Sequence, residues 1–156
     1  GDNIIVNTNH YKDFIASSIH IFRNIIDHGI ETIEERAYAE KSEFAEVITH
    51  FNKEKDKFTV KFEDNGRGMN LDALANKALE KGLVSNNELS KFSNQQILDL
   101  IFKEGFSTKE DVTTISGRGV GMDAVKNVVE KIGGEISVLS TEGKGTTLVV
   151  KMPILL

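Results

Sequence analysis

A run of alternating glycines, Ser116–Asp123, opens directly onto an amphipathic helix and constrains this chain more than any other feature of its sequence. Apolar side chains then recur at helical spacing, at Met122, Val125, Val128, Val129 and Ile132, before Gly133-Gly134 ends the helix. Glycines let the backbone approach a ligand closely, and the first turn of a helix offers unpaired N–H groups to phosphate oxygens. The run therefore indicates an anion site, although a glycine-rich turn without a ligand explains these residues equally well when they are taken alone.

Two common phosphate-binding motifs are excluded. The chain has no G-x-x-x-x-G-K-[ST] sequence, which rules out a P-loop. A dinucleotide fingerprint needs a buried strand directly before the glycines, but residues 104–118 are polar and rich in turn formers. We expect that segment to form a mobile flap.

Composition limits the remaining function classes. The 156 residues suit one domain, and 39% hydrophobic with 28% charged residues is ordinary for a globular chain. No apolar run approaches the roughly 18 residues that span a membrane, and there is no signal-peptide pattern, so we expect a cytoplasmic protein. The absence of cysteine excludes disulfides and thiolate chemistry. A net charge of −5 argues against nucleic-acid or anionic-membrane partners, so local positive groups must meet any phosphate ligand.

The order of elements predicts an α+β two-layer sandwich. Hydrophobic periodicity indicates helices over 10–28, 32–40, 71–81, 94–103 and from 122 onward. Strands are expected over 44–51, 57–64, 135–140 and 146–152, the first two joined by a charged turn at 52–56. Helices and hairpin-connected strands alternate without a regular βαβ rhythm, which favours this class over a doubly wound sheet.

The first helix carries a polar stripe. Four side chains fall within an arc of about 100° at 3.6 residues per turn: His20, Asn24, Asp27 and His28. The predicted apolar face lies opposite and comprises Ile15, Ile19, Phe22 and Ile26. The stripe is either a ligand-facing wall or a solvated helix face. A zinc site at His20, Asp27 and His28 is the third interpretation and the weakest, because no further well-spaced histidine joins them.

Asp64 breaks the pattern of the second strand. Phe58, Val60 and Phe62 alternate with polar residues, so the period of two places Asp64 on the apolar side. An ionised carboxylate only accepts hydrogen bonds, which matches the amino group of adenine and not the carbonyl of guanine. The following Asn65–Met69 segment contains two glycines that let a flat ligand approach the backbone. The alternative is an Asp-Asn-Gly turn in which the carboxylate caps its own backbone.

Taken together, these segments resemble the ordered boxes of the GHKL ATP-binding superfamily. The boxes are Asn24 on a polar helix, Asp64–Gly68, Gly117–Gly121 and Gly143–Thr146. Within the superfamily the chain is most similar to the CheA-like chemotaxis histidine kinases. His20–Glu31 resembles the N box of that group, Leu100–Thr108 its F box and lid entry, and Ser116–Asp123 its second glycine box. The resemblance covers residues 11 to 153.

The resemblance implies a Bergerat-type ATP site between helices and one face of a mixed, mostly antiparallel sheet. It implies that Asn24 holds Mg²⁺, with His20, Asp27 and His28 nearby, and that Asp64 takes the adenine amino group. The remaining implied ATP contacts are Gly66, Gly68, Met69, Lys77, Ser107, Thr108, Gly117, Arg118, Gly119, Val120, Gly121, Met122 and Thr146, with an ATP lid over 107–118. Two positions depart from many relatives: Asn65 replaces an aspartate, and Ala73 replaces a lysine.

His20 separates the subclasses, because hydrolytic members of the superfamily usually place a glutamate there. We therefore expect His20 and Asn24 to serve phosphotransfer from ATP to a histidine on a separate phosphotransfer domain. The chain is expected to be a single catalytic domain, 1–156, excised from a longer kinase. Its implied partners are that phosphotransfer domain, a response regulator, and a receptor or coupling protein reached through other domains. Two alternatives remain open: a non-catalytic nucleotide-sensing module and an autonomous ATPase.

Overall fold

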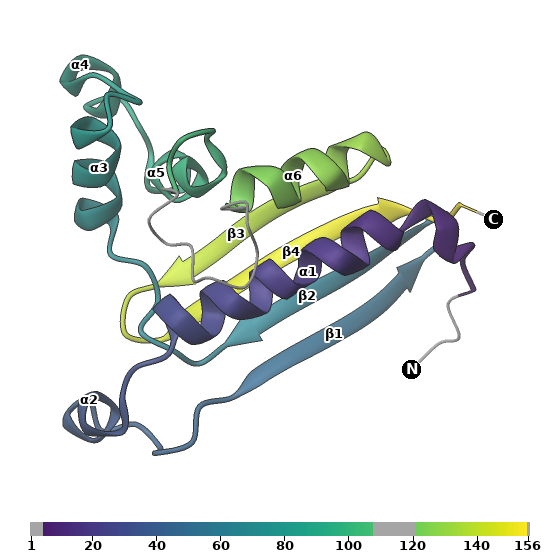
Figure 1. Cartoon of the computed structure of the whole chain (residues 1–156). Coiled ribbons are helices and arrows are strands. Elements are labelled where there is room, and N and C mark those ends of the chain that lie inside the picture. The colour runs from purple at the N-terminus through teal and green to yellow at the C-terminus, as the bar shows by residue number, and fades with distance from the viewer. Residues whose placement is uncertain (1–4, 108–120, 156) are drawn as a thin grey trace.

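The computed structural model describes residues 5–107 and 121–155, which form a four-stranded sheet with helices on one face (Figure 1). The strands are β1 (Val47–Glu54), β2 (Lys57–Asp64), β3 (Glu135–Thr141) and β4 (Gly145–Pro153), in the order β1-β2-β4-β3. This architecture confirms the α+β class. Every strand pair in the described chain is antiparallel, so the expectation of a mixed sheet is corrected.

Two long helices cover the inner face of the sheet, α1 (Lys12–Asn24) and α6 (Met122–Lys131). Beneath them β2 buries the predicted Phe58, Val60 and Phe62, but Thr59 is buried as well, so the alternation is not strict. These three lie opposite Met152, Val150 and Leu148 of β4, so both central strands present apolar side chains to the same side. This layer forms the main hydrophobic core of the protein.

The buried face of α1 differs from the one predicted. Ile15, Ile19 and Ile26 are 58%, 57% and 64% exposed, whereas the residues of the helical segment that pack inward are Phe14, Ser17, Ile21 and Ile25. Both stripes have helical spacing and lie side by side on the helix, so periodicity alone does not choose between them. The buried face includes the polar Ser17, which made this face hard to recognise in the sequence. The Ser17 hydroxyl tolerates burial because it donates to the carbonyl of Phe14 at 2.9 Å.

The first hairpin is tighter than predicted. Residues 52–54 continue β1 and pair with residues 57–59 of β2, so the strand ends three residues later than expected. The reversal needs only Lys55 and Asp56, and Lys55 takes a positive φ of 47°. The polar residues that indicated a long turn are therefore strand residues on an exposed edge.

The remaining helices are short, and all but η2 and η3 begin with a side-chain cap. They are η1 (Thr8–His10), the π turn η2 (Ile25–Gly29), α2 (Ile33–Tyr38), α3 (Leu71–Glu80), α4 (Asn86–Leu89), α5 (Asn94–Leu98) and η3 (Asp99–Phe102). The predicted helix over 94–103 is thus α5 continued by a 3₁₀ segment, while η1 and α4 were not predicted. Capping boxes start α2, α4 and α5. None of the helices in the described ranges is long and apolar enough to cross a membrane.

Candidate nucleotide site

A cavity of about 260 Å³ opens where the C-terminal ends of α1 and β2 meet α3 and the start of α6. Most of its lining is apolar, contributed by Ile21, Ile25, Met69, Leu74, Ile101, Phe106, Met122 and Leu148. The polar side chains in the lining are Asn24, His28, Asp64, Lys77, Ser107 and Thr146. An apolar cavity with a few convergent polar groups is the usual form of a small-molecule site.

Asp64 is the buried carboxylate of this cavity. It ends β2 with 6% exposure, and its Oδ1 accepts the backbone N–H groups of Gly66 at 2.9 Å and Thr146 at 3.3 Å. Burial raises the pKa of Asp64, and these two backbone hydrogen bonds oppose the rise. The carboxylate therefore caps its own turn through Oδ1, while among the described residues no donor is hydrogen-bonded to Oδ2. The turn-capping interpretation is therefore confirmed for Oδ1, and the contact of Asp64 with adenine stays a prediction.

The glycines after Asp64 are required by backbone packing. A Cβ on Gly66 would lie 2.2 Å from the carbonyl oxygen of Gly29, and one on Gly68 would lie 2.2 Å from that of Thr141. Gly68 also has a positive φ of 66°. Gly68 lines the cavity and Gly66 does not, so close chain packing, rather than ligand approach alone, explains this pair of glycines.

The π turn η2 rearranges the predicted polar stripe. Its wider turn is closed by a bond from the Ile30 N–H to the Ile25 carbonyl at 2.9 Å, and such turns are frequent at functional sites. Asn24 and His28 line the cavity, whereas Asp27 is exposed and His20 lies one turn earlier, outside the lining. Partial burial, followed by the charge of Arg23, lowers the pKa of His20. The structure thus brings two of the four predicted residues to the cavity.

Lys77 stands at a cationic rim of the cavity. Its Nζ lies 5.3 Å from the centroid of the Phe106 ring, a cation–π contact, and the Lys81 Nζ donates to the Phe106 carbonyl at 2.7 Å. A Cβ on Gly121 would lie 2.9 Å from the Cβ of Ser107. The start of α6 is therefore adjacent to Ser107, and its N-cap residue, Gly121, makes no side-chain cap.

Several predicted residues lie outside the described part of the chain. They are Thr108, Gly117, Arg118, Gly119 and Val120, together with the rest of the predicted lid after Ser107. Among the predicted residues that are described, Met69, Met122 and Thr146 line the cavity, and Gly121 is the N-cap of α6 without lining it.

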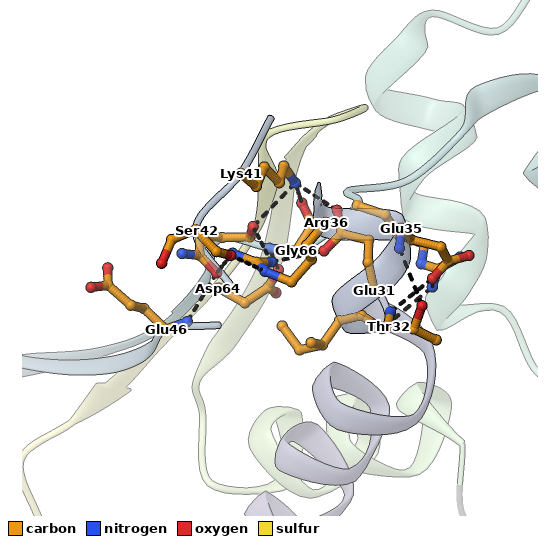
Figure 2. Close-up of polar contacts among 12 residues, drawn as sticks. Glu31, Thr32, Glu35, Arg36, Lys41, Ser42, Glu46, Asp64 and Gly66 are labelled. Atoms are coloured by element: carbon orange, nitrogen blue, oxygen red, sulfur yellow. Dashed lines mark hydrogen bonds and ion pairs between the residues drawn. The ribbon is translucent and has the colours of Figure 1, made fainter. Parts of the chain in front are cut away.

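A polar cluster that the sequence did not predict lies beside Asp64 and Gly66 (Figure 2). Arg36 of α2 is 1% exposed and forms a salt bridge with Glu31. Lys41 forms a second salt bridge with Glu31 (Figure 2). The Thr32–Glu35 capping box predicts the helix that carries Arg36, but no sequence pattern reports that a charged side chain on so short a helix is buried.

The donor set fits a magnesium nucleotide better than a protein-bound metal. Among the described residues, no group of three or more His, Cys, Asp or Glu side chains could hold a metal ion, as zinc would require. Asn24 supplies one hard amide oxygen to the cavity, and Mg²⁺ commonly takes few protein ligands alongside phosphate and water oxygens. The Oδ2 atom of Asp64, which accepts no hydrogen bond from the described residues, fits the amino group of adenine.

Comparison with solved structures agrees with this fold. The histidine kinase domain from the Erythrobacter litoralis EL346 blue-light activated histidine kinase superposes with a TM-score of 0.55 over 98% of this chain and 48% of that chain, at 15% identity. At that identity the likeness shows the fold alone. The chain thus shares the fold of that domain, a sheet with helices on one face.

Sequence comparison gives the family. Residues 16–156 match the model of the histidine kinase-, DNA gyrase B- and HSP90-like ATPases, and the chain belongs to this family. It is 41% identical over 138 residues to the chemotaxis protein CheA of Bacillus subtilis, covering 88% of this chain and 20% of that protein. It is 44% identical over 138 residues to the sensor histidine kinase CheAY of Helicobacter pylori, covering 88% and 17%. The resemblance to CheA-like kinases is confirmed, and the chain spans about a fifth of these relatives' length.

Proposed function

We propose that this domain binds Mg·ATP and transfers the γ-phosphate to a histidine on a separate phosphotransfer domain, in chemotaxis-type signalling. The proposal concerns one catalytic domain of a longer kinase, whose phosphorylated histidine then passes the phosphoryl group to a response regulator. A receptor or coupling protein would reach it through other domains. Support comes from the family and from the CheA kinases among the relatives.

The observation that carries the proposal is the buried Asp64 carboxylate in the cavity wall. Its Oδ1 is occupied by two backbone donors, and its Oδ2 is the acceptor that the amino group of adenine needs. Guanine presents a carbonyl at that place, which an ionised carboxylate repels. The surrounding apolar lining, including Ile25, Met69 and Leu148, offers a flat ring dry surfaces on which to pack.

We assign the phosphates to the polar and cationic groups of the same cavity. The Asn24 amide oxygen would hold the Mg²⁺, which supplies charge neutralisation at the phosphates when bound. The Lys77 ammonium would exchange its contact with the Phe106 ring for a phosphate oxygen, and the start of α6 would add backbone donors. Phosphoryl transfer depends mainly on positioning and charge stabilisation, so these groups suffice for presenting a γ-phosphate.

The acceptor histidine is assigned to another domain. His20 takes the place of a hydrolytic glutamate, and burial with the nearby Arg23 lowers its pKa, which favours a neutral imidazole at physiological pH. His28 lines the cavity itself, while His50 lies on the exposed strand β1 beside Glu63. We assign His20 to proton handling at an incoming phosphotransfer histidine rather than to activation of water.

Nucleotide discrimination and phosphotransfer test the proposal together. Calorimetry should show ATP preferred over GTP, and Asp64→Asn should weaken ATP binding by about 1.5–3 kcal/mol, the range for a hydrogen bond to a charged group. Radiolabel from [γ-³²P]ATP should reach a separately produced histidine phosphotransfer domain and should not reach it with Asn24→Ala. ATP binding without transfer would instead indicate a nucleotide-sensing module. Steady phosphate release without an acceptor would indicate an autonomous ATPase.

A further inference from the structure

We propose that Arg36 and Lys41 are positioning residues for the adenine end of the site: they hold the two peptide groups after Asp64 and thereby fix and electrostatically balance its carboxylate. The inference rests on the proposed contact between Asp64 and adenine. Figure 2 shows the two cations and Glu31 gathered beside Asp64 and Gly66.

Arg36 uses all its hydrogen-bonding capacity in this cluster. A guanidinium has five N–H donors, and here they meet five acceptors. Nε donates to the Ser42 carbonyl at 2.6 Å, and Nη1 to Glu31 Oε2 at 2.9 Å and the Asn65 carbonyl at 3.3 Å. Nη2 donates to the Phe44 carbonyl at 3.2 Å and to Asn65 Oδ1 at 3.4 Å. A fully satisfied, buried guanidinium ties the segment after α2 to the segment after β2.

Lys41 completes the attachment. Its Nζ donates to Glu31 Oε1 at 2.6 Å, to the Asn65 carbonyl at 3.2 Å and to the Gly66 carbonyl at 2.6 Å. The carbonyls of both residues that follow Asp64 are therefore held by cations from a distant segment. The N–H of Gly66 belongs to the same peptide group as the Asn65 carbonyl, and it donates to Asp64 Oδ1. A displacement of that peptide group would therefore move the carboxylate with it.

Asn65 explains how the chain accommodates its departure from many relatives. Its Oδ1 accepts the Glu46 N–H at 2.9 Å as well as the Arg36 Nη2, so the position is used purely as an acceptor. A carboxylate could make both contacts, so the aspartate that the resemblance implies at this position would fit the same fold. Neither contact involves the cavity, which leaves Asp64 as the acceptor that faces the ligand.

The charges of the cluster balance in pairs. Burial would raise the pKa of Glu31, but hydrogen bonds from Lys41, its own backbone and Arg36, with the charge of Lys41, hold it below its usual value. Two cations, Arg36 and Lys41, thus meet two carboxylates, Glu31 and Asp64. After burial and the bonds from Gly66 and Thr146, the charge of Glu31 raises the pKa of Asp64 and that of Lys41 lowers it.

The test uses two substitutions with opposite expected signs. ADP affinity is measured by calorimetry between pH 5 and 8 in the wild type, Lys41→Met and Glu31→Gln. Removing the lysine charge should move the acid loss of ADP binding to higher pH, because that charge lowers the pKa of Asp64. Removing the glutamate charge should move the acid loss of ADP binding to lower pH, even if the ADP affinity at neutral pH falls. His28 and Lys77 also face the cavity, and Arg36 lies in the cluster; all three remain in both variants.

Controls separate this inference from loss of folding and from failure of the proposed function. Lys126→Met removes a surface lysine that pairs with Glu130 at 3.7 Å, and it should leave the pH profile unchanged. Thermal unfolding confirms that each variant is folded. A merely structural role predicts that both cluster variants lose affinity without opposite pH shifts, and that result would overturn the inference. If Asp64→Asn leaves ADP affinity intact, the proposed adenine contact itself is wrong.

Discussion

At the scale of single residues, Asp64 combines a cost to the fold with a benefit to binding. Burial raises its pKa above the usual value for an aspartate, so the ionised form is less favourable in the folded chain than in the unfolded one. Below the usual pKa the residue is protonated in both states and this cost is absent. The cost develops as the pH rises from the usual pKa to the raised one and is complete above it.

Asp64→Asn should therefore stabilise the protein at neutral pH relative to acid pH. An asparagine keeps an oxygen for the N–H groups of Gly66 and Thr146 and carries no charge. The difference in free energy of unfolding, variant minus wild type, should grow as the pH rises from about 4 to 7, measured by urea denaturation. A difference independent of pH would show that Asp64 titrates alike in both states.

Residue identities at the site were predictable only where a motif or a local pattern marks them. Asp64 was recognisable because it continues an apolar alternation, and Asn24 because of the resemblance. Arg36 was not recognisable, since its burial depends on carbonyls at residues 42, 44 and 65 that converge only in the folded chain. A local sequence pattern does not show that carbonyl groups from distant residues will accept the hydrogen bonds of a buried charge.

At the scale of elements, α1 shows where periodicity fails. Two adjacent stripes on this helix both carry isoleucines, and the sheet selects the one containing Ile21 and Ile25. The π turn after Asn24 then shifts the phase, so residues spaced for one helical face diverge, and Asp27 points to solvent while His28 reaches the cavity. The sequence contains no marker of the extra residue in that turn.

The corrected face of α1 is testable by paired truncations. Ile21 is fully buried, and Ile21→Ala should cost about 2–5 kcal/mol of unfolding free energy because it leaves a cavity. Ile19 is 57% exposed, and Ile19→Ala should change stability by no more than about 0.5 kcal/mol. Denaturant titration of both variants decides the matter, and equal costs would restore the face predicted from the sequence.

At the scale of the whole molecule, the cavity is assembled from segments spread over most of the chain. Its lining comes from the end of α1 and η2, the loop after β2, α3, η3, the start of α6 and β4. The α+β class and the two hairpin pairings followed from local patterns, since hairpins pair neighbours in sequence, whereas the pairing of β2 with β4 was not predicted. The apolar wall of the cavity could not be predicted in this way, because core residues and cavity-lining residues show the same sequence pattern. Only the packing of the helices on the sheet distinguishes them.

Because so many elements contribute to the cavity, ADP should stabilise the whole fold rather than one loop. A ligand that binds only the folded state at 100 times its Kd adds about 2.7 kcal/mol to the free energy of unfolding. For a domain of this size that corresponds to a Tm increase of roughly 5–10 °C. The measurement is a thermal melt with matched concentrations of ADP and GDP, in the wild type and in Asp64→Asn. ADP should raise the wild-type Tm far more than GDP, and the variant should lose most of that difference because it loses the charged acceptor for adenine. Equal increases with both nucleotides would mean that the phosphate end alone holds the ligand, and the adenine role of Asp64 would have to be abandoned.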